Sequence, residues 1–262
     1  MYTPVPTHST CAQAWLAACH TLLNQTGHET YNVVLDVAEP TNFSTDDAKI
    51  VVAVDQFLQE HKENPVATVA NTIFPWDLYQ RYGSPDFYDA YKRAFARFTT
   101  SKKWGRYFER MITLPSQSGD VVNPLEDLVS RVRQQVGSKR TFRSIYELNL
   151  YDPIADIKRN RGRQCLSFLS FKVDRERGLL LTAIYRNHHY VARLLGNLIG
   201  LARLQAFVAK EGGTIVGSLT CISTHAVLDT KPWKLTDVRG LLGRIDNRFC
   251  EARTPNSEPL DY

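Results

Sequence analysis

The sequence lacks the features that mark several protein classes. It contains no apolar run approaching the roughly 20 residues that cross a bilayer, and its most apolar early stretch, 12–23, contains His20 and lacks a basic leader. Its five cysteines are scattered, without the CxxC pairs of a zinc site or the framework of a small secreted domain. We therefore expect a cytoplasmic protein with no metal centre and no membrane segment, in which at least one cysteine is free.

The sequence also lacks a large excess of charge of either sign. The net formal charge is +5 over 262 residues, of which 43% are hydrophobic, 23% charged and 11% aromatic. This composition excludes disorder as the dominant state. The basic residues form small clusters rather than the stripe typical of a polynucleotide binder, so we expect no polynucleotide partner; the clusters suit an anionic small molecule or ordinary surface charge. They lie at 102–103, 138–143, 158–163 and 175–177.

Hydrophobic periodicity predicts helices in the first half and strands in the second. We expect helices over 9–23, 46–61, 123–135 and 190–210, short helices across 74–99, and strands over 31–37, 141–146, 166–173, 179–185 and 214–223. Helix 190–210 is apolar on most sides and should be central, with Gly196 and Gly200 explained by close packing against the sheet. The tail that follows is punctuated by proline and glycine. No linker or repeat interrupts the chain, so we predict one α+β domain over 1–262.

Cys165 is the first candidate for chemistry. It precedes a predicted strand and follows Arg159, Arg161 and Arg163, whose cations could stabilise a thiolate nucleophile. The alternative is an inert cysteine at a strand end, which is the commoner case.

A second candidate lies at the strand-to-helix junction 185–190. Arg186 and the backbone N–H groups of a helix N-terminus together favour an anion such as phosphate. His188 and His189 are adjacent and do not form the i, i+4 pair of a metal site. Asn197 is a strongly polar side chain within the apolar helix, and it requires a partner, for which a ligand is one candidate.

Taken in order, these features resemble the thymidylate synthase superfamily. Ser138-Lys139-Arg140 is similar to the family's Ser-Arg-Arg segment, whose arginines reach the phosphate site of the partner subunit. Residues 163–166 resemble its Pro-Pro-Cys-His, which implies that Cys165 is the nucleophile that adds to pyrimidine C6. Residues 185–187 resemble Gln-Arg-Ser, in which the arginine holds the phosphate.

The resemblance extends to the groups that hold the base and the sugar. Asn197 lies eleven residues after Arg186, at the position of the asparagine that reads the O4 and N3 edge of the base. Ser223 and His225 occupy the positions of the His and Tyr that hold the sugar hydroxyl, and 25–27 resembles Arg-Thr-Gly. The resemblance is best over 123–228 and faint over 9–37.

The family implies a fold and a chemistry. We expect a three-layer fold with a mixed sheet packed by helices, a homodimer formed sheet against sheet, a nucleotide substrate and 5,10-methylenetetrahydrofolate as the one-carbon donor. The activity implied is transfer of a methyl or hydroxymethyl unit to C5 of a pyrimidine, and Asn197 favours a uracil-type edge because an amide can donate to O4 and accept from N3–H.

Departures from the family keep a second hypothesis open. Gln25 replaces the phosphate arginine, Leu166 replaces a histidine, and Asn187 and His189 replace a serine and an aspartate. A Glu-Leu-Leu-Trp-Phe motif is not found, and 257–262 lacks the apolar tail that closes on folate. The alternative is a non-methylating superfamily member that binds a nucleotide or serves as a structural dimer. An RNA-binding protein ranks last, since no aromatic-basic motif is recognisable.

Overall fold

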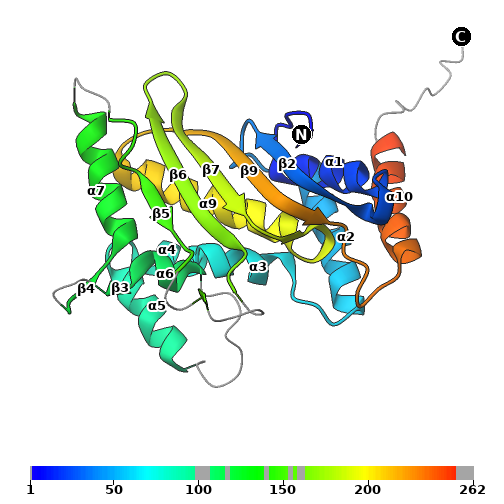
Figure 1. Ribbon diagram of the computed structural model, residues 1–262, viewed down its shortest axis with the longest axis horizontal. Coiled ribbons are helices and arrows are strands. Elements are labelled where there is room, and N and C mark those ends of the chain that lie inside the picture. Colours follow the sequence, from blue (N-terminus) through cyan, green and yellow to red (C-terminus); the bar gives the residue numbers. More distant parts are fainter. Residues whose placement is uncertain are drawn as a thin grey trace, which may run out of the picture.

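The computed structural model describes residues 2–97, 107–115, 119–138, 142–152, 156–157 and 163–251. Within these residues a seven-stranded sheet has the order β1-β2-β9-β7-β6-β5, with β8 beside β9 (Figure 1). β9 is parallel to β7 and antiparallel to β2, so the sheet is mixed. The strands are β1 (Thr3–Pro4), β2 (Glu29–Val37), β5 (Glu147–Asn149), β6 (Leu166–Asp174), β7 (Gly178–Tyr185), β8 (His188–His189) and β9 (Val216–Val227). The predicted α+β class with a mixed, helix-packed sheet is confirmed.

One long helix organises the core behind the strands. The helix α9 (Leu195–Gly212) lies against β7 and β9, and α1 (Cys11–Leu23), α3 (Val66–Ile73) and α7 (Pro124–Val136) pack on it (Figure 1). Along β9 the residues Leu219 and Cys221 are fully buried, whereas their neighbours Thr220 and Ile222 are only partly buried. Because successive side chains in a strand point to opposite faces, this alternation distinguishes the helix-covered face from the other one.

The glycines of α9 pack against a helix, so the expectation that they face the sheet is wrong. A Cβ added to Gly196 would lie 2.5 Å from Val69 Cβ, and one added to Gly200 would lie 2.7 Å from the carbonyl oxygen of Ala70. Both neighbours belong to α3. The missing side chains let the two helix backbones approach, which compensates for the low helix propensity of glycine.

Most predicted helices are confirmed to within a few residues. Helix α1 begins after Thr10, whose hydroxyl accepts the N–H of Gln13, and α2 (Thr45–Glu60) begins with a capping box formed by Ser44 and Asp47. Asn123 caps α7. The short helices expected across 74–99 are α4 (Trp76–Tyr82) and α5 (Asp86–Arg97).

The strand predicted over 141–146 is wrong. Thr141 lies outside the described residues, and 142–146 has no strand pairing, which begins only at Glu147. The contact of this segment with β6 is one backbone hydrogen bond, from the N–H of Phe171 to the carbonyl of Tyr146 at 2.8 Å, and the Gln135 side chain holds the segment from α7. Gln135 Oε1 accepts the N–H of Phe142 at 2.9 Å and the hydroxyl of Tyr146 at 2.9 Å.

The sequence interpretation missed several elements. The largest is α10 (Leu235–Glu251), in the region expected to be an irregular tail; its buried residues Val238, Leu241, Leu242 and Ile245 have helical spacing. Also missed were α3, α6 (Tyr107–Ile112) and a short ribbon of β3 (Leu114–Pro115) and β4 (Val121–Val122).

The segment Tyr190–Gly212 is long and apolar enough to cross a bilayer by length and composition alone. However, 72% of its most apolar window is buried inside the protein. Its apolar character is therefore explained by its place at the centre of the core.

Candidate functional site

Cys165 lies immediately before β6, at the end of the sheet where β7 finishes. Its N–H and that of Leu166 both donate to the hydroxyl of Tyr107, at 3.3 and 3.4 Å. Its carbonyl accepts the N–H of Arg186 at 3.0 Å. The backbone around the thiol is thus held from α6 on one side and from the end of β7 on the other.

The electrostatic environment of Cys165 has two opposing parts. The side chain is partly buried, and this burial raises the pKa of the thiol, whereas the guanidinium of Arg186 lowers that pKa by a smaller amount. Arg159 and Arg161 lie outside the described residues, and Arg163 Nη2 donates to the carbonyl of Ile157 at 3.1 Å. Among the described cations, Arg186 is therefore the one that acts on the thiol.

Arg186 is exposed and anchored at one end. Its Nε donates to the carbonyl of Gln164 at 2.8 Å, and its own carbonyl accepts the hydroxyl of Thr224 at 3.0 Å. Its Nη1 and Nη2 atoms make no hydrogen bond with the described residues. The guanidinium therefore carries two groups of donors beside Cys165 that an anion could occupy.

The helix N-terminus expected to assist Arg186 is already occupied. A π-helix (Tyr190–Leu194) precedes α9, and the Asp229 carboxylate accepts the N–H groups of Val191 at 2.8 Å and Ala192 at 3.2 Å. Burial raises the pKa of Asp229, while these two N–H groups and His189 lower it. Two first-turn donors are thus taken by a protein carboxylate, and an anion beside Cys165 would depend on the guanidinium.

Asn197 has a protein partner, His188. Asn197 Nδ2 lies 2.8 Å from His188 Nε2, and His188 Nδ1 lies 3.0 Å from Ser223 Oγ, which also accepts the hydroxyl of Tyr190 at 3.2 Å. All four side chains are buried. Burial lowers the pKa of His188 to about 3, so its ring is neutral at neutral pH, with one nitrogen donating and the other accepting.

The other predicted sugar-binding residue lies nearer the surface. His225 Nδ1 is 2.6 Å from Asn187 Oδ1, and its Nε2 is 3.2 Å from Glu29 Oε2. The turn at 25–27 reaches the same end of the sheet, since the N–H of Leu228 donates to the carbonyl of His28 at 2.9 Å. The structure thus gathers Arg186, Asn187 and His225 around one strand end, with Asn197 and Ser223 buried behind them.

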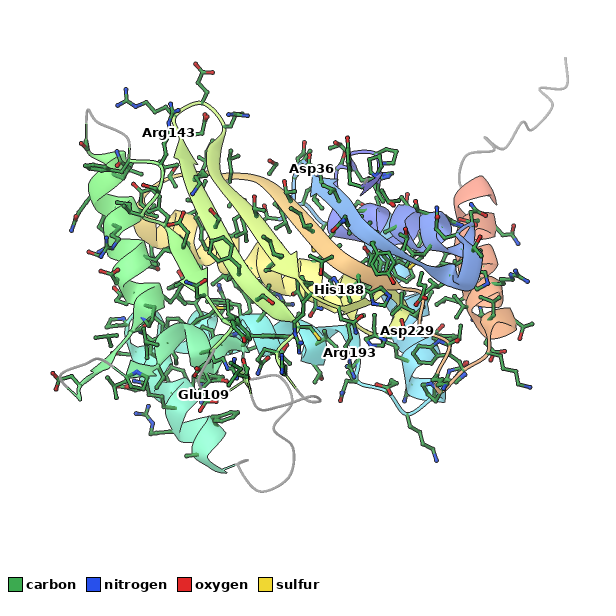
Figure 2. All side chains as sticks on the ribbon, in the orientation of Figure 1. Asp36, Glu109, Arg143, His188, Arg193 and Asp229 are labelled. Atoms are coloured by element: carbon green, nitrogen blue, oxygen red, sulfur yellow. The ribbon has the colours of Figure 1, made fainter. Side chains whose placement is uncertain are left out.

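Four residues of this site were not assigned a role from the sequence. Tyr107 comes from α6; burial raises its pKa to about 12, and Cys165 contributes. The Tyr185 hydroxyl is buried and has no hydrogen-bond partner in the described part of the chain, and its ring stacks on His188 with centroids 4.0 Å apart. Arg193 forms an ion pair with Glu63 at 3.2 Å, and Asp229 caps the helix. Figure 2 shows His188, Arg193 and Asp229 at the same end of the sheet.

Tyr107 and Asp229 carry no local sequence signal because they enter the site from distant segments, whereas Tyr185 and Arg193 lie in or just after the junction 185–190. Lys139 and Arg140, the predicted cross-subunit cations, lie outside the described residues. Across the described ranges, no three His, Cys, Asp or Glu side chains cluster in a way that could hold a metal ion.

Comparison with known proteins adds two relatives, and no family model matches the chain. One relative, from Methanocaldococcus jannaschii, bears the name "Putative thymidylate synthase" and is 25% identical over 180 residues, covering 64% of this chain and 78% of that protein. A second, from Methanosarcina barkeri, has the same name and is 27% identical over 116 residues, covering 44% of this chain and half of that protein. At 25–27% identity, these likenesses support the resemblance to the thymidylate synthase superfamily as that of a divergent member.

Proposed function

We propose that this protein transfers a one-carbon unit, methyl or hydroxymethyl, to C5 of a uracil-type pyrimidine nucleotide through a covalent adduct at Cys165. The observation that carries the proposal is the pairing of Cys165 with Arg186, whose backbone N–H donates to the Cys165 carbonyl at 3.0 Å and whose outer nitrogens are free of described partners. A nucleophile and an anion site are thereby adjacent.

The chemical steps follow from that pairing. The Cys165 thiolate forms a bond to C6, and the C5–C6 π electrons move toward C5 and O4. C5 then attacks the one-carbon electrophile, and the electron pair of the attacked carbon–heteroatom bond moves to that heteroatom. C5 loses its proton to solvent, and the electron pair left on C5 restores the C5–C6 double bond as the Cys165 thiolate departs. Because burial raises the thiol pKa, the thiol is protonated in the free protein at neutral pH and must lose its proton when the nucleotide binds.

Recognition is assigned to the residues that the resemblance marks. Arg186 binds the phosphate, Asn197 reads the base, and Asn187, His225 and Ser223 hold the sugar side, with Lys139 and Arg140 supplied by a second subunit. His188 orients Asn197 through the 2.8 Å contact. The unpartnered Tyr185 hydroxyl offers a further polar group near Cys165.

The folate donor, 5,10-methylenetetrahydrofolate, is suggested by the family resemblance alone. In the described part of the chain, the buried side-chain polar atoms without a partner are His8 Nε2, Tyr185 Oη and Gln205 Oε1. Of these three atoms, only Tyr185 Oη belongs to this site, and a bound pyrimidine would supply its hydrogen-bond partner. The described residues thus identify no pterin site.

The proposal also includes two points of organisation. The chain forms one continuous domain, and two copies associate as a homodimer. Val34, Ile222, Ile184 and Phe168 are register partners across β2, β9, β7 and β6, and all are partly buried on the face opposite α9. An apolar row across four strands supports a second copy packing there, sheet against sheet. We place the protein in the cytoplasm.

The test uses deoxyuridylate tritiated at C5 and 5-fluorodeoxyuridylate. Wild type should release tritium to water and gain the mass of the fluorinated nucleotide, and Cys165→Ser should do neither. Cys221→Ala is the matched control, because the Cys221 thiol is fully buried and should not react. An adduct that survives Cys165→Ser would contradict the assignment, and nucleotide binding without tritium release would favour the non-methylating alternative.

A calorimetric titration tests the phosphate site separately. Arg186→Ala should weaken deoxyuridylate about tenfold or more and leave uridine unchanged, since a charge-assisted contact contributes roughly 1.5 to 3 kcal/mol. Arg177→Ala, an exposed arginine paired with Asp174 in the β6–β7 hairpin, should change neither. Equal losses for the nucleotide and the nucleoside would remove the phosphate role from Arg186.

A further inference from the structure

A cavity of about 400 Å³ lies between α2, α3 and α9. Its lining is mostly apolar and includes Ala12, Phe43, Val51, Trp76, Ile199 and Ala206. It shares no residue with the Cys165 site. Ile199 follows Asn197 by two positions, which places it about 200° around the helix, so the two sites use different faces of α9.

Arg203 lines this cavity and forms no ion pair with the part of the chain that the structure describes. Arg203 is partly buried, and burial lowers its pKa although Asp77 acts in the opposite direction. With the described residues its guanidinium makes one hydrogen bond, to Asn71 Oδ1 at 3.2 Å, and no ion pair. A partly desolvated guanidinium with a single neutral partner can bind an anion strongly.

The two aspartates among the described lining residues, Asp47 and Asp55, already have hydrogen-bond partners within the protein. Asp47 accepts hydrogen bonds from the Thr10 hydroxyl at 2.6 Å and from Ser44, and Asp55 accepts the N–H of Val66 at 2.7 Å. Val66 and Asn71, the α3 residues beside Asp55 and Arg203, are five positions apart, or about 7.5 Å along the helix. Arg203 and Asp55 are therefore separated along the cavity, and both lining carboxylates are already bonded within the protein.

We propose that this cavity is a second ligand site, separate from the Cys165 site, for a small amphipathic organic anion. Its apolar body would fill the space beneath Phe43 and Trp76, and its carboxylate, sulfonate or phosphate would bind Arg203. Phe43 is 58% exposed and lines the cavity, so the ligand would also cover apolar surface that now faces water.

The test uses two fluorescent probes that share one aromatic body. One is 8-anilinonaphthalene-1-sulfonate, an anion, and the other is N-phenyl-1-naphthylamine, which lacks the sulfonate. Wild type should bind one equivalent of each. Arg203→Gln, which can still donate to Asn71, should weaken the sulfonate probe about tenfold or more and leave the neutral probe unchanged.

Three controls tie the binding to this cavity. Arg131→Gln removes an exposed guanidinium paired with Asp127 and should affect neither probe. Ala206→Leu should weaken both probes by filling the cavity, and Cys165→Ser should affect neither. Failure of wild type to bind the sulfonate probe, unchanged sulfonate affinity in Arg203→Gln, or equal losses for both probes in that variant would each overturn the proposal.

Discussion

At the scale of single residues, the site is defined by which polar groups have partners. Asn197, His188, Ser223 and Tyr190 satisfy one another in a buried network, whereas the neighbouring Tyr185 hydroxyl has no partner among the described residues. Burying an unpaired hydroxyl costs stability, while removing one member of a bonded pair leaves the other unsatisfied. The two tyrosines should therefore respond to the same substitution in different ways.

Tyr190→Phe should lower the free energy of unfolding by about 1 to 2 kcal/mol, because it removes the hydrogen bond to Ser223. Tyr185→Phe should leave that free energy unchanged or raise it, because the lost hydroxyl has no partner among the described residues. Urea unfolding of both variants measures the difference. Equal destabilisation by the two substitutions would mean that the Tyr185 hydroxyl has a partner in solution.

His188 should make stability depend on pH. Its folded-state pKa of about 3 lies below the ordinary value of 6.5, so between these values the unfolded chain binds a proton that the native protein does not. The free energy of unfolding therefore rises with pH in this window and falls as the solution is acidified. From pH 8 to pH 5 the loss should be about 2 kcal/mol.

In His188→Gln, the loss of unfolding free energy between pH 8 and pH 5 should be smaller than in wild type by about 2 kcal/mol. His20→Gln, which removes a partly exposed histidine and leaves the buried His188 network in place, serves as the matched histidine control. If His188→Gln and wild type lose the same unfolding free energy over this pH range, a group other than His188 is responsible for the loss.

At the scale of elements, close helix contact decides where glycine is required. Gly196 in α9 leaves no room for a Cβ beside Val69, whereas Gly243 in α10 has no atom within 4 Å of that position. Helix propensity alone predicts a gain of up to about 1 kcal/mol from alanine at either position. The contact with Val69 should turn this expected gain in stability into a loss at Gly196, and the gain should remain at Gly243.

Gly196→Ala should lower the free energy of unfolding by about 1 to 3 kcal/mol, because the new methyl group would push α9 away from α3. Gly243→Ala should raise it by up to about 1 kcal/mol. Thermal and urea unfolding of the pair provide the measurement. A gain in both variants would show that α3 shifts at little cost.

At the scale of the whole molecule, the sheet face opposite α9 is the one that should meet a second copy. Wild type should have the mass of a dimer at micromolar concentration. Ile222→Asp should shift it toward the monomer, because it puts a charge into the apolar row described above. Ile215→Asp is the control, since Ile215 is 66% exposed and precedes β9. Analytical ultracentrifugation compares the three, and a monomeric wild type would contradict the interface.

Local patterns in the sequence determined the elements whose stabilisation is local or periodic. The apolar periodicity of α2 and α7 and the β-type runs of β6 and β7 predicted their elements closely, and the structure places caps at Ser44 and Asn123 where these two helices begin. The spacing from Arg186 to Asn197 likewise indicated the family. These signals lie within a few residues of the structure they specify, so no tertiary information is needed to read them.

Only the tertiary structure decided how the predicted site residues are engaged. It brought Tyr107 to the backbone of Cys165, assigned the first donors of the central helix to Asp229, and paired Asn197 with His188. It also replaced the predicted strand at 142–146 with bonds to Gln135 and placed α9 glycines against α3. Each of these contacts joins residues whose partners are set by packing and by the need to satisfy buried polar groups, conditions that arise only once the chain has folded.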